Sequence, residues 1–207
     1  MTPEAEPVGV SVSDAVERVV PDRLRRLGPG VADLLEPVEE RPSLTDALRT
    51  TGRVCGLLVA LAALAWGSGY PYLFPSLGPS AYALAVSPSA ATSRPRRVVG
   101  AHLFGVLGGL LAYHSLAAGL TVTQPSPALS IDALRLAASA LLSLGLTSLA
   151  MLTTDLRHAP ACATTLIVSL GLLTSLTEAG VILSAVLVLV ATDALLPGFD
   201  GVEVPPR

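Results

Sequence analysis

The sequence predicts an all-α membrane protein, and three observations lead to this fold class. Hydrophobic residues make up 51% of the 207 residues, mean hydropathy is +0.64, and only 14% of residues are charged, whereas soluble domains carry about 25% charged residues. Of the 16 acidic residues, 10 lie in the first 50 positions. Six apolar segments follow that acidic stretch. We therefore expect a helical bundle of six transmembrane segments.

The six apolar segments differ in length and composition. A helix needs about 20 apolar residues to cross a bilayer, and the third, fourth and sixth segments approach or reach that length. The second and fifth are shorter and richer in Pro, Ser and Thr. Four full helices plus two broken or re-entrant segments are therefore the alternative. In chain order the segments span residues 54–72, 72–91, 98–118, 134–153, 159–175 and 179–196.

The positions of arginine favour six crossings. Positive charge collects on the cytoplasmic side of a membrane protein. With six crossings, the connections that carry Arg53, residues 94–97 and Arg157 all fall on one side, and the arginine-free connections fall on the other. Arg135 is the exception. The prediction is a multi-pass protein of the plasma (inner) membrane with both termini in the cytoplasm.

Six crossings divide into two triplets that enter the membrane from opposite sides, which is the inverted-repeat arrangement. The predicted repeats span residues 50–118 and 132–197 of one transmembrane domain, 50–197. A cytosolic segment, partly helical or disordered, precedes it over residues 1–49, and a tail follows over 198–207. Residues 43–46 resemble a helix N-cap with an acidic residue three positions on, so we expect a helix to start there.

The two short segments carry most of the candidate substrate-binding residues. Each contains proline and a small-residue cluster, at 78–81 and 162–165. Interrupted segments in corresponding halves point to a binding site near the bilayer midplane. Helices that begin near Pro79 and Pro160 would direct free N–H groups and positive dipole ends there, which suits a small anion. The predicted substrate-binding residues are Ser80, Ala81, His102, His158, Thr164 and Thr165.

Other interpretations of these residues stay open. Any one small or hydroxyl residue is explained by helix packing or by a bond to its own helix, and the two clusters together favour a site. His102 lies within a span, where ionisable residues are functional candidates. His158 is a gate, a proton-linked switch, an anion contact or an interfacial cap. For Asp193, a helix-end hydrogen bond and proton coupling remain alternatives. A close-packing face is predicted at Gly105, Gly108 and Gly109.

No pattern typical of an enzyme is present, since the sequence has no phosphate loop, no Ser–His–Asp arrangement and no His-Glu-x-x-His. Cys55 and Cys162 lie too far apart to indicate a zinc site, and two cysteines do not make a disulfide framework. We expect no catalytic residue, cofactor, metal or nucleic-acid partner. The expected partners are the lipid bilayer and a small inorganic anion, and a homo-oligomer is left open.

Three blocks of the sequence resemble the HPP family of integral membrane proteins. The family is named for a His-Pro-Pro motif followed by small residues, and His158–Ile167 (HAPACATTLI) resembles it, with further resemblance at 74–81 and 95–102. Ala159 replaces the middle proline and Cys162 a glycine. The resemblance covers residues 50–197. The family is usually described with four spanning helices, and some chloroplast and cyanobacterial members are associated with nitrite transport.

The sequence and the resemblance together predict a small-anion transporter or channel, with nitrite as the leading candidate. A second hypothesis makes the membrane part a scaffold or sensor and the first 50 residues a signalling segment. Deleting residues 1–40 separates the two hypotheses, because transport survives the deletion only if the membrane part is the transporter.

Overall fold

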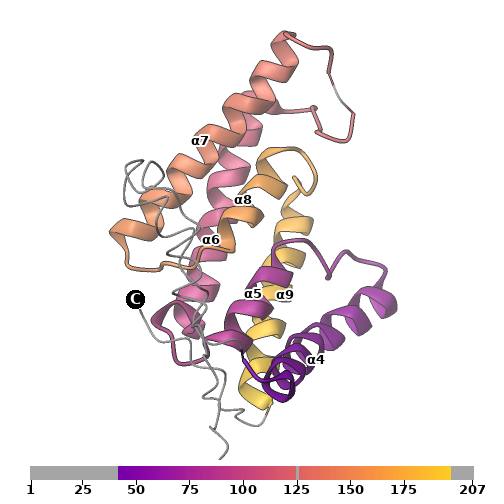
Figure 1. Ribbon diagram of the computed structural model, residues 1–207. Helices are drawn as coiled ribbons and strands as arrows, with labels where there is room; N and C mark the ends of the chain where they lie inside the picture. Colours follow the sequence, from indigo (N-terminus) through magenta and orange to yellow (C-terminus); the bar gives the residue numbers. More distant parts are fainter. Residues whose placement is uncertain (1–41, 125, 197–207) are drawn as a thin grey trace, which may run out of the picture. The chain divides into compact units, whose positions relative to one another are not determined.

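The computed structural model describes residues 42–124 and 126–196, and all of the regular structure in this part of the chain is helical (Figure 1). Most of the predicted cytosolic segment and the predicted tail lie outside the described residues. A 3₁₀ turn, Ala91–Ser93, precedes α6, and a π-helical turn, Tyr113–Ala117, continues it. The α-helices are α4 (Leu44–Ser68), α5 (Leu77–Val86), α6 (Pro95–Ala112), α7 (Ile131–Thr153), α8 (Ala161–Ser169) and α9 (Leu176–Leu195). The predicted all-α class is confirmed.

Four of these helices are long and apolar enough to cross a membrane, namely α4, α6 with its π-helical turn, α7 and α9. The other two, α5 and α8, contain 10 and 9 residues. At a rise of about 1.5 Å per residue they reach roughly half of a hydrocarbon core about 30 Å thick. Of the two predicted alternatives, the structure therefore shows four full helices with two short ones between them.

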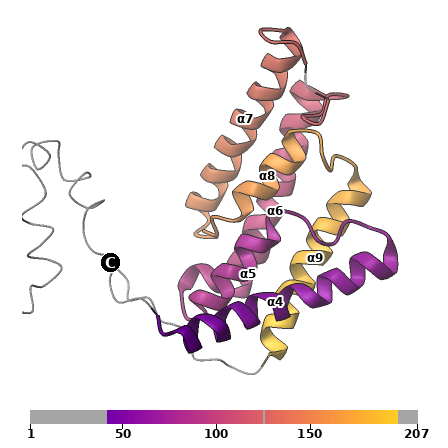
Figure 2. The ribbon, with the colours of Figure 1, turned by 45° about the vertical axis from the view of Figure 1, so that its right-hand side comes forward.

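The connections that flank α6 and α8 meet in pairs, one pair at each end of these two helices (Figures 1 and 2). At one end the α5–α6 connection meets the α7–α8 connection, where Nδ1 of His158 donates to the carbonyl of Thr92 at 3.0 Å. At the other end the α6–α7 connection meets the α8–α9 connection, where the amide of Val122 donates to the carbonyl of Leu170 at 2.9 Å. The segment that contains the short helix α8, with the turns on either side of it, therefore runs from one of these ends to the other.

The two halves of the described chain have the same order of elements, a long, a short and a long helix. In the first half α5 packs on α4, and in the second α8 packs on α7. Across the halves, α5 packs on α9 and α8 on α6, while α4 packs on α9 and α7 on α6. An inverted repeat would produce this pattern of neighbours. The two-fold relation itself stays a prediction.

The distribution of side chains differs from that in a soluble domain, although most of the buried residues are apolar. Large apolar side chains such as Trp66, Leu141 and Leu149 are exposed, whereas the interior contains hydroxyl and imidazole groups. In water, exposed leucines on several helices would be costly, but lipid solvates them. The fully buried polar side chains include Ser80, His102, Ser139, Ser143, Thr164, Thr165 and Ser169.

Glycines on α6 let α7 and α8 approach its backbone closely. A Cβ atom at Gly105 would lie 2.9 Å from the carbonyl oxygen of Ala161, and one at Gly109 would lie 2.7 Å from Cβ of Val168. At Gly108 the corresponding distance, to the hydroxyl of Thr147, is 2.8 Å. Side chains do not fit at such distances, so the predicted close-packing face is confirmed. This contact holds α8 against α6.

Replacing Gly109 with alanine is expected to destabilise the protein by about 1–3 kcal/mol, because the added methyl group overpacks the α6–α8 contact. The measurement is the thermal transition of the detergent-solubilised protein. Gly145→Ala on α7 is the matched control, since no atom lies within 4 Å of its added Cβ and alanine favours a helix over glycine. Equal transitions for the two variants would contradict a tight α6–α8 contact.

Candidate functional site

Five buried side chains with hydroxyl or imidazole groups meet where α5 and α8 begin. We call them the buried polar cluster. None exposes more than 1% of its surface. They come from five different places in the fold: the residue before α5, α5 itself, α6, the residues before α8, and α8. The cluster consists of Ser76, Ser80, His102, His158 and Thr164.

Proline determines where both short helices begin. α5 starts at Leu77, and Pro79 lies in its first turn, where the missing amide proton would have no intrahelical acceptor. α8 starts at Ala161, directly after Pro160. Both starts lie within two residues of the positions that the sequence predicts. Ser80 and Thr164 consequently stand in the first turns of their helices.

The first amide groups of the short helices are already hydrogen-bonded. The amides of Ala161 and Cys162 donate to the carbonyls of His158 and Ala159, at 3.1 and 3.0 Å, and the amide of Leu77 donates to a carbonyl three residues earlier. The chain enters both helices through tight turns of this kind, which use these donors. The prediction of free N–H groups at these helix starts is therefore wrong for Leu77, Ala161 and Cys162. Side chains fill the space between the two helix starts.

Ser80 stands at the centre of the cluster. Its Oγ lies 3.0 Å from Nε2 of His102 and 3.1 Å from Nε2 of His158. A third neighbour of the hydroxyl is the carbonyl oxygen of Ser76 on the preceding turn, at 3.0 Å. The rings of the two histidines lie 5.5 Å apart, centre to centre. One hydroxyl group therefore joins two buried imidazoles.

The remaining cluster contacts extend this arrangement in both directions. Nδ1 of His102 lies 2.7 Å from the hydroxyl of Thr164, which lies 2.7 Å from the hydroxyl of Ser76. On the other side, Nδ1 of His158 donates to the Thr92 carbonyl. The result is one continuous chain of hydrogen bonds from Ser76 to Thr92, through both histidines.

The structure brings four of the six predicted site residues together, namely Ser80, His102, His158 and Thr164. Thr165 points toward α7 instead, where its hydroxyl lies 2.9 Å from that of Thr147. Ala81 is buried among apolar side chains of the core. The substrate-binding role of all six stays a prediction.

Sequence reasoning missed Ser76, although a signal for it was available. Ser76 occupies the N-cap position of α5, but its side chain makes no capping bond there. By contrast, Ser130 and Ser175 cap α7 and α9 in the usual way, by accepting from amides of the first turn. A serine at a helix start inside a short apolar segment therefore deserved consideration as a site residue.

Two further polar residues of the long helices, His114 and Asp193, lie away from the cluster. His114 is exposed in the π-helical turn and donates through Nε2 to the Thr174 carbonyl at 3.2 Å. Asp193 on α9 accepts from Nη2 of Arg53 on α4 at 2.7 Å. Asp193 therefore makes a hydrogen bond near the end of α9, and proton coupling through it stays a prediction.

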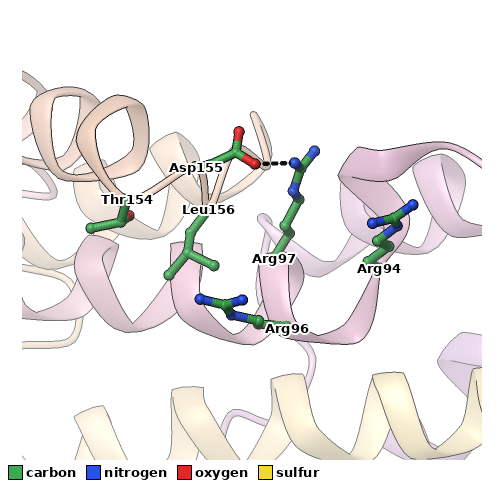
Figure 3. A pocket seen from close by; sticks show the side chains of 6 residues that line it. All are labelled: Arg94, Arg96, Arg97, Thr154, Asp155 and Leu156. Atoms are coloured by element: carbon green, nitrogen blue, oxygen red, sulfur yellow. Dashed lines mark hydrogen bonds and ion pairs between the residues drawn. The ribbon is translucent and has the colours of Figure 1, made fainter.

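A cavity of about 310 Å³ lies at the start of α6, and we call it the arginine mouth (Figure 3). Figure 3 shows Arg97 directed at Asp155, with which it forms an ion pair. Arg94 and Arg96 are exposed, and no ion pair involves them within the described residues. The cavity is lined by Arg94, Arg96, Arg97, Thr154, Asp155 and Leu156.

Asp155 lies just beyond the C-terminal end of α7 and forms an ion pair with Arg97 in the arginine mouth. Its backbone is in the left-handed region (φ 55°), which aspartate tolerates better than most residues. Hydrogen bonds from Arg157, and secondarily from Arg97, lower the pKa of its carboxyl group. The mouth adjoins the cluster along the chain, because Leu156 lies two residues before His158 and Arg94 two residues after Thr92.

Comparison with known protein families matches residues 39–196 to the family described as HPP, transmembrane region. The chain belongs to the HPP transmembrane family. The match covers most of the sequence and includes all the helices described above. Together with four long apolar helices, membership of this family makes the protein an integral membrane protein in contact with the lipid bilayer. No curated protein and no solved structure matches the chain.

In this HPP protein the departures from the family motif lie beside the cluster rather than within it. Cys162 is half-buried and packs with Phe104 against a small group of apolar side chains that includes Met151. Ala159 contributes a carbonyl that accepts from the Cys162 amide. Among the motif residues 158, 159 and 162, only His158 belongs to the buried polar cluster.

Proposed function

We propose that this HPP protein moves a small inorganic anion across the membrane, as a transporter or channel, and that nitrite is the leading candidate. The observation that carries the proposal is the buried polar cluster. Ionisable and hydroxyl groups at membrane depth are costly, and they are typical of substrate pathways. Here two histidines and three hydroxyl groups lie together inside the bundle.

The chemistry of the cluster supports an anion rather than a cation. Hydroxyl and imidazole groups can all donate hydrogen bonds, and the cluster contains no carboxylate. It lies at the N-terminal ends of α5 and α8, where the helix dipole places partial positive charge. The adjoining arginine mouth adds guanidinium groups that attract anions from solution.

The arrangement corresponds to a closed pathway. Cluster atoms contact one another directly, at distances from 2.7 Å between Ser76 and Thr164 to 3.1 Å between Ser80 and His158. An anion must therefore replace some of these hydrogen bonds with its own. Nitrite suits this exchange, because it is small, carries one charge and accepts hydrogen bonds through both oxygen atoms and nitrogen.

The arginine mouth also supports an orientation. Since positive residues collect on the cytoplasmic side, the proposal places the mouth at the cytoplasmic face of the plasma membrane. The pair between Arg53 and Asp193 joins the N-terminal half of α4 to the C-terminal end of α9. Both chain termini would then face the cytoplasm.

The test is uptake by liposomes that contain the purified full-length protein. Nitrite, nitrate, chloride and sulfate are compared with potassium, and empty vesicles give the background. We expect nitrite to enter faster than sulfate, which carries two charges and is held more strongly by water. Anion uptake no greater than that of empty vesicles would overturn the proposal, and so would selective uptake of potassium.

Replacing both Arg94 and Arg96 with glutamine is expected to slow anion uptake about tenfold at low salt, because the mouth then attracts fewer anions. The difference should shrink at high salt, since the screening length falls from about 30 Å at 0.01 M to about 3 Å at 1 M. The matched control is Arg135→Gln, because Arg135 bonds the Leu116 carbonyl at the opposite end of α6. A salt-independent loss of uptake would contradict electrostatic attraction.

A further inference from the structure

We propose that His158 binds one proton and that this proton crosses the membrane with the anion, which makes the protein a proton–anion symporter. The inference rests on the proposed function and names its coupling ion. It follows from the directions of the hydrogen bonds in the buried polar cluster.

The Thr92 carbonyl determines the tautomer of His158. A carbonyl oxygen only accepts, so Nδ1 of His158, at 3.0 Å, carries a hydrogen. In a neutral imidazole the other nitrogen, Nε2, is then an acceptor. Among the described residues, the group placed to donate to this nitrogen is the Ser80 hydroxyl, at 3.1 Å.

The same argument assigns the opposite tautomer to His102. If the Ser80 hydroxyl donates to His158, its oxygen accepts from Nε2 of His102, at 3.0 Å. Nδ1 of His102 is then an acceptor for the Thr164 hydroxyl, and Thr164 accepts in turn from Ser76. Two neutral histidines therefore satisfy every side-chain contact between the cluster residues, and these bonds all run in one direction, while the Ser76 carbonyl, 3.0 Å from the Ser80 hydroxyl, does not receive its hydrogen.

His158 can bind one additional proton if a single group, the Ser80 hydroxyl, rotates. When Nε2 of His158 binds a proton, it becomes a donor to the oxygen of Ser80. The Ser80 hydroxyl then turns to the Ser76 carbonyl, which already lies 3.0 Å away. A new N–H bond forms, no covalent bond breaks, and every other hydrogen bond is unchanged. If His102 bound the proton instead, at Nδ1, the hydroxyls of both Thr164 and Ser76 would have to reverse the direction in which they donate.

The charges around His158 indicate why the proton and the anion would bind together. Within the described residues, α5 contributes no charged group near His158, α8 contributes the thiol of Cys162, and α6 contributes His102 and the arginines of the mouth. The carboxylate beside these, Asp155, is bonded to Arg97 and Arg157. A protonated His158 therefore has no buried counter-charge, and a bound anion would supply one. Each ligand raises the affinity of the other.

Proteoliposomes that enclose a pH-sensitive dye test the coupling. We expect nitrite entry to acidify the lumen, to be driven by an acidic exterior and to carry no net current. His158→Gln should lose the acidification and the response to the pH gradient, whereas His114→Gln, at the exposed π-helical turn, should retain both. Empty vesicles under the same gradient give the leak of nitrous acid through lipid.

The possible failures are distinguishable. Nitrite uptake that carries current without acidification would overturn symport and leave the proposed function intact. The absence of all anion uptake would overturn both.

A measurement without transport uses the unaltered protein. The chain has only three histidines, so nitrogen-15 labelling of histidine gives a simple NMR spectrum, and His114→Gln removes one set of signals. We expect His158 to carry its hydrogen on Nδ1 and His102 on Nε2 at neutral pH, and His158 to bind a proton first on acidification. Identical tautomers, or earlier protonation of His102, would overturn the inference even if His158→Gln did not fold.

Discussion

Replacing Ser80 with alanine is expected to reduce anion flux roughly tenfold or more while the protein remains folded. The hydroxyl of Ser80 joins both histidines, at 3.0 and 3.1 Å, and no other described side chain is hydrogen-bonded to both rings. Alanine keeps the size of the site but leaves buried imidazole nitrogens without a partner. Such a loss costs about 1–3 kcal/mol, and about 1.4 kcal/mol corresponds to a factor of ten in binding.

The matched control for Ser80→Ala is Ser143→Ala. Ser143 is also fully buried, but its hydroxyl donates to the Ala140 carbonyl on its own helix, α7. Flux of anion and the thermal transition are measured for both variants in the same preparation. Normal flux in Ser80→Ala would remove Ser80 from the pathway, and equal loss of flux in Ser143→Ala would mean that any buried hydroxyl has this effect.

Much of the candidate site could be predicted because its signals are local. Pro79 and Pro160 interrupt apolar segments, and that is enough to place the starts of α5 and α8 within two residues. An ionisable residue within an apolar span, such as His102, is costly and therefore conspicuous in a sequence. His158 precedes a proline-initiated helix in the second half, as Ser76 does in the first.

The features of the site that the sequence did not predict depend on packing between helices that are far apart in the sequence. The partner of His158 is the backbone carbonyl of Thr92, and no side-chain pattern identifies a carbonyl. Whether Thr165 faces the cluster or α7 is decided by one step of about 100° around α8, which periodicity alone does not fix. The pairing of Arg53 with Asp193 joins residues 140 positions apart.

Composition alone also could not show where the short helices begin and end within the apolar segments. Hydropathy marks residues 72–91 and 159–175 as apolar, but α5 and α8 occupy only the middle of these segments. The flanking residues form turns whose carbonyls accept the first amides of each helix. Because those bonds use the amides of Leu77, Ala161 and Cys162, the groups that face one another at the site are side chains.

Replacing Asp193 with leucine is expected to destabilise the protein by about 3–5 kcal/mol, because it leaves a buried guanidinium without a counter-charge. The side chain of Arg53 is 6% exposed, and its Nε and Nη1 atoms have no hydrogen-bond partner among the described residues. Asp193 therefore supplies the charge that keeps Arg53 in place between α4 and α9. The measurement is the thermal transition of the purified protein in detergent.

The reverse change, Arg53→Met, should cost less, because the Asp193 side chain is 22% exposed and water can reach its carboxylate. Replacing both residues, by methionine and leucine, should restore most of the stability, since an apolar pair of similar size often substitutes for a buried ion pair. Asp132→Asn is the matched control. Its pair with Arg135 is exposed on both sides, so its loss should cost no more than about 1 kcal/mol. A double variant as unstable as Asp193→Leu would show that the ion pair itself, and not the unpaired arginine, determines the stability of the α4–α9 contact.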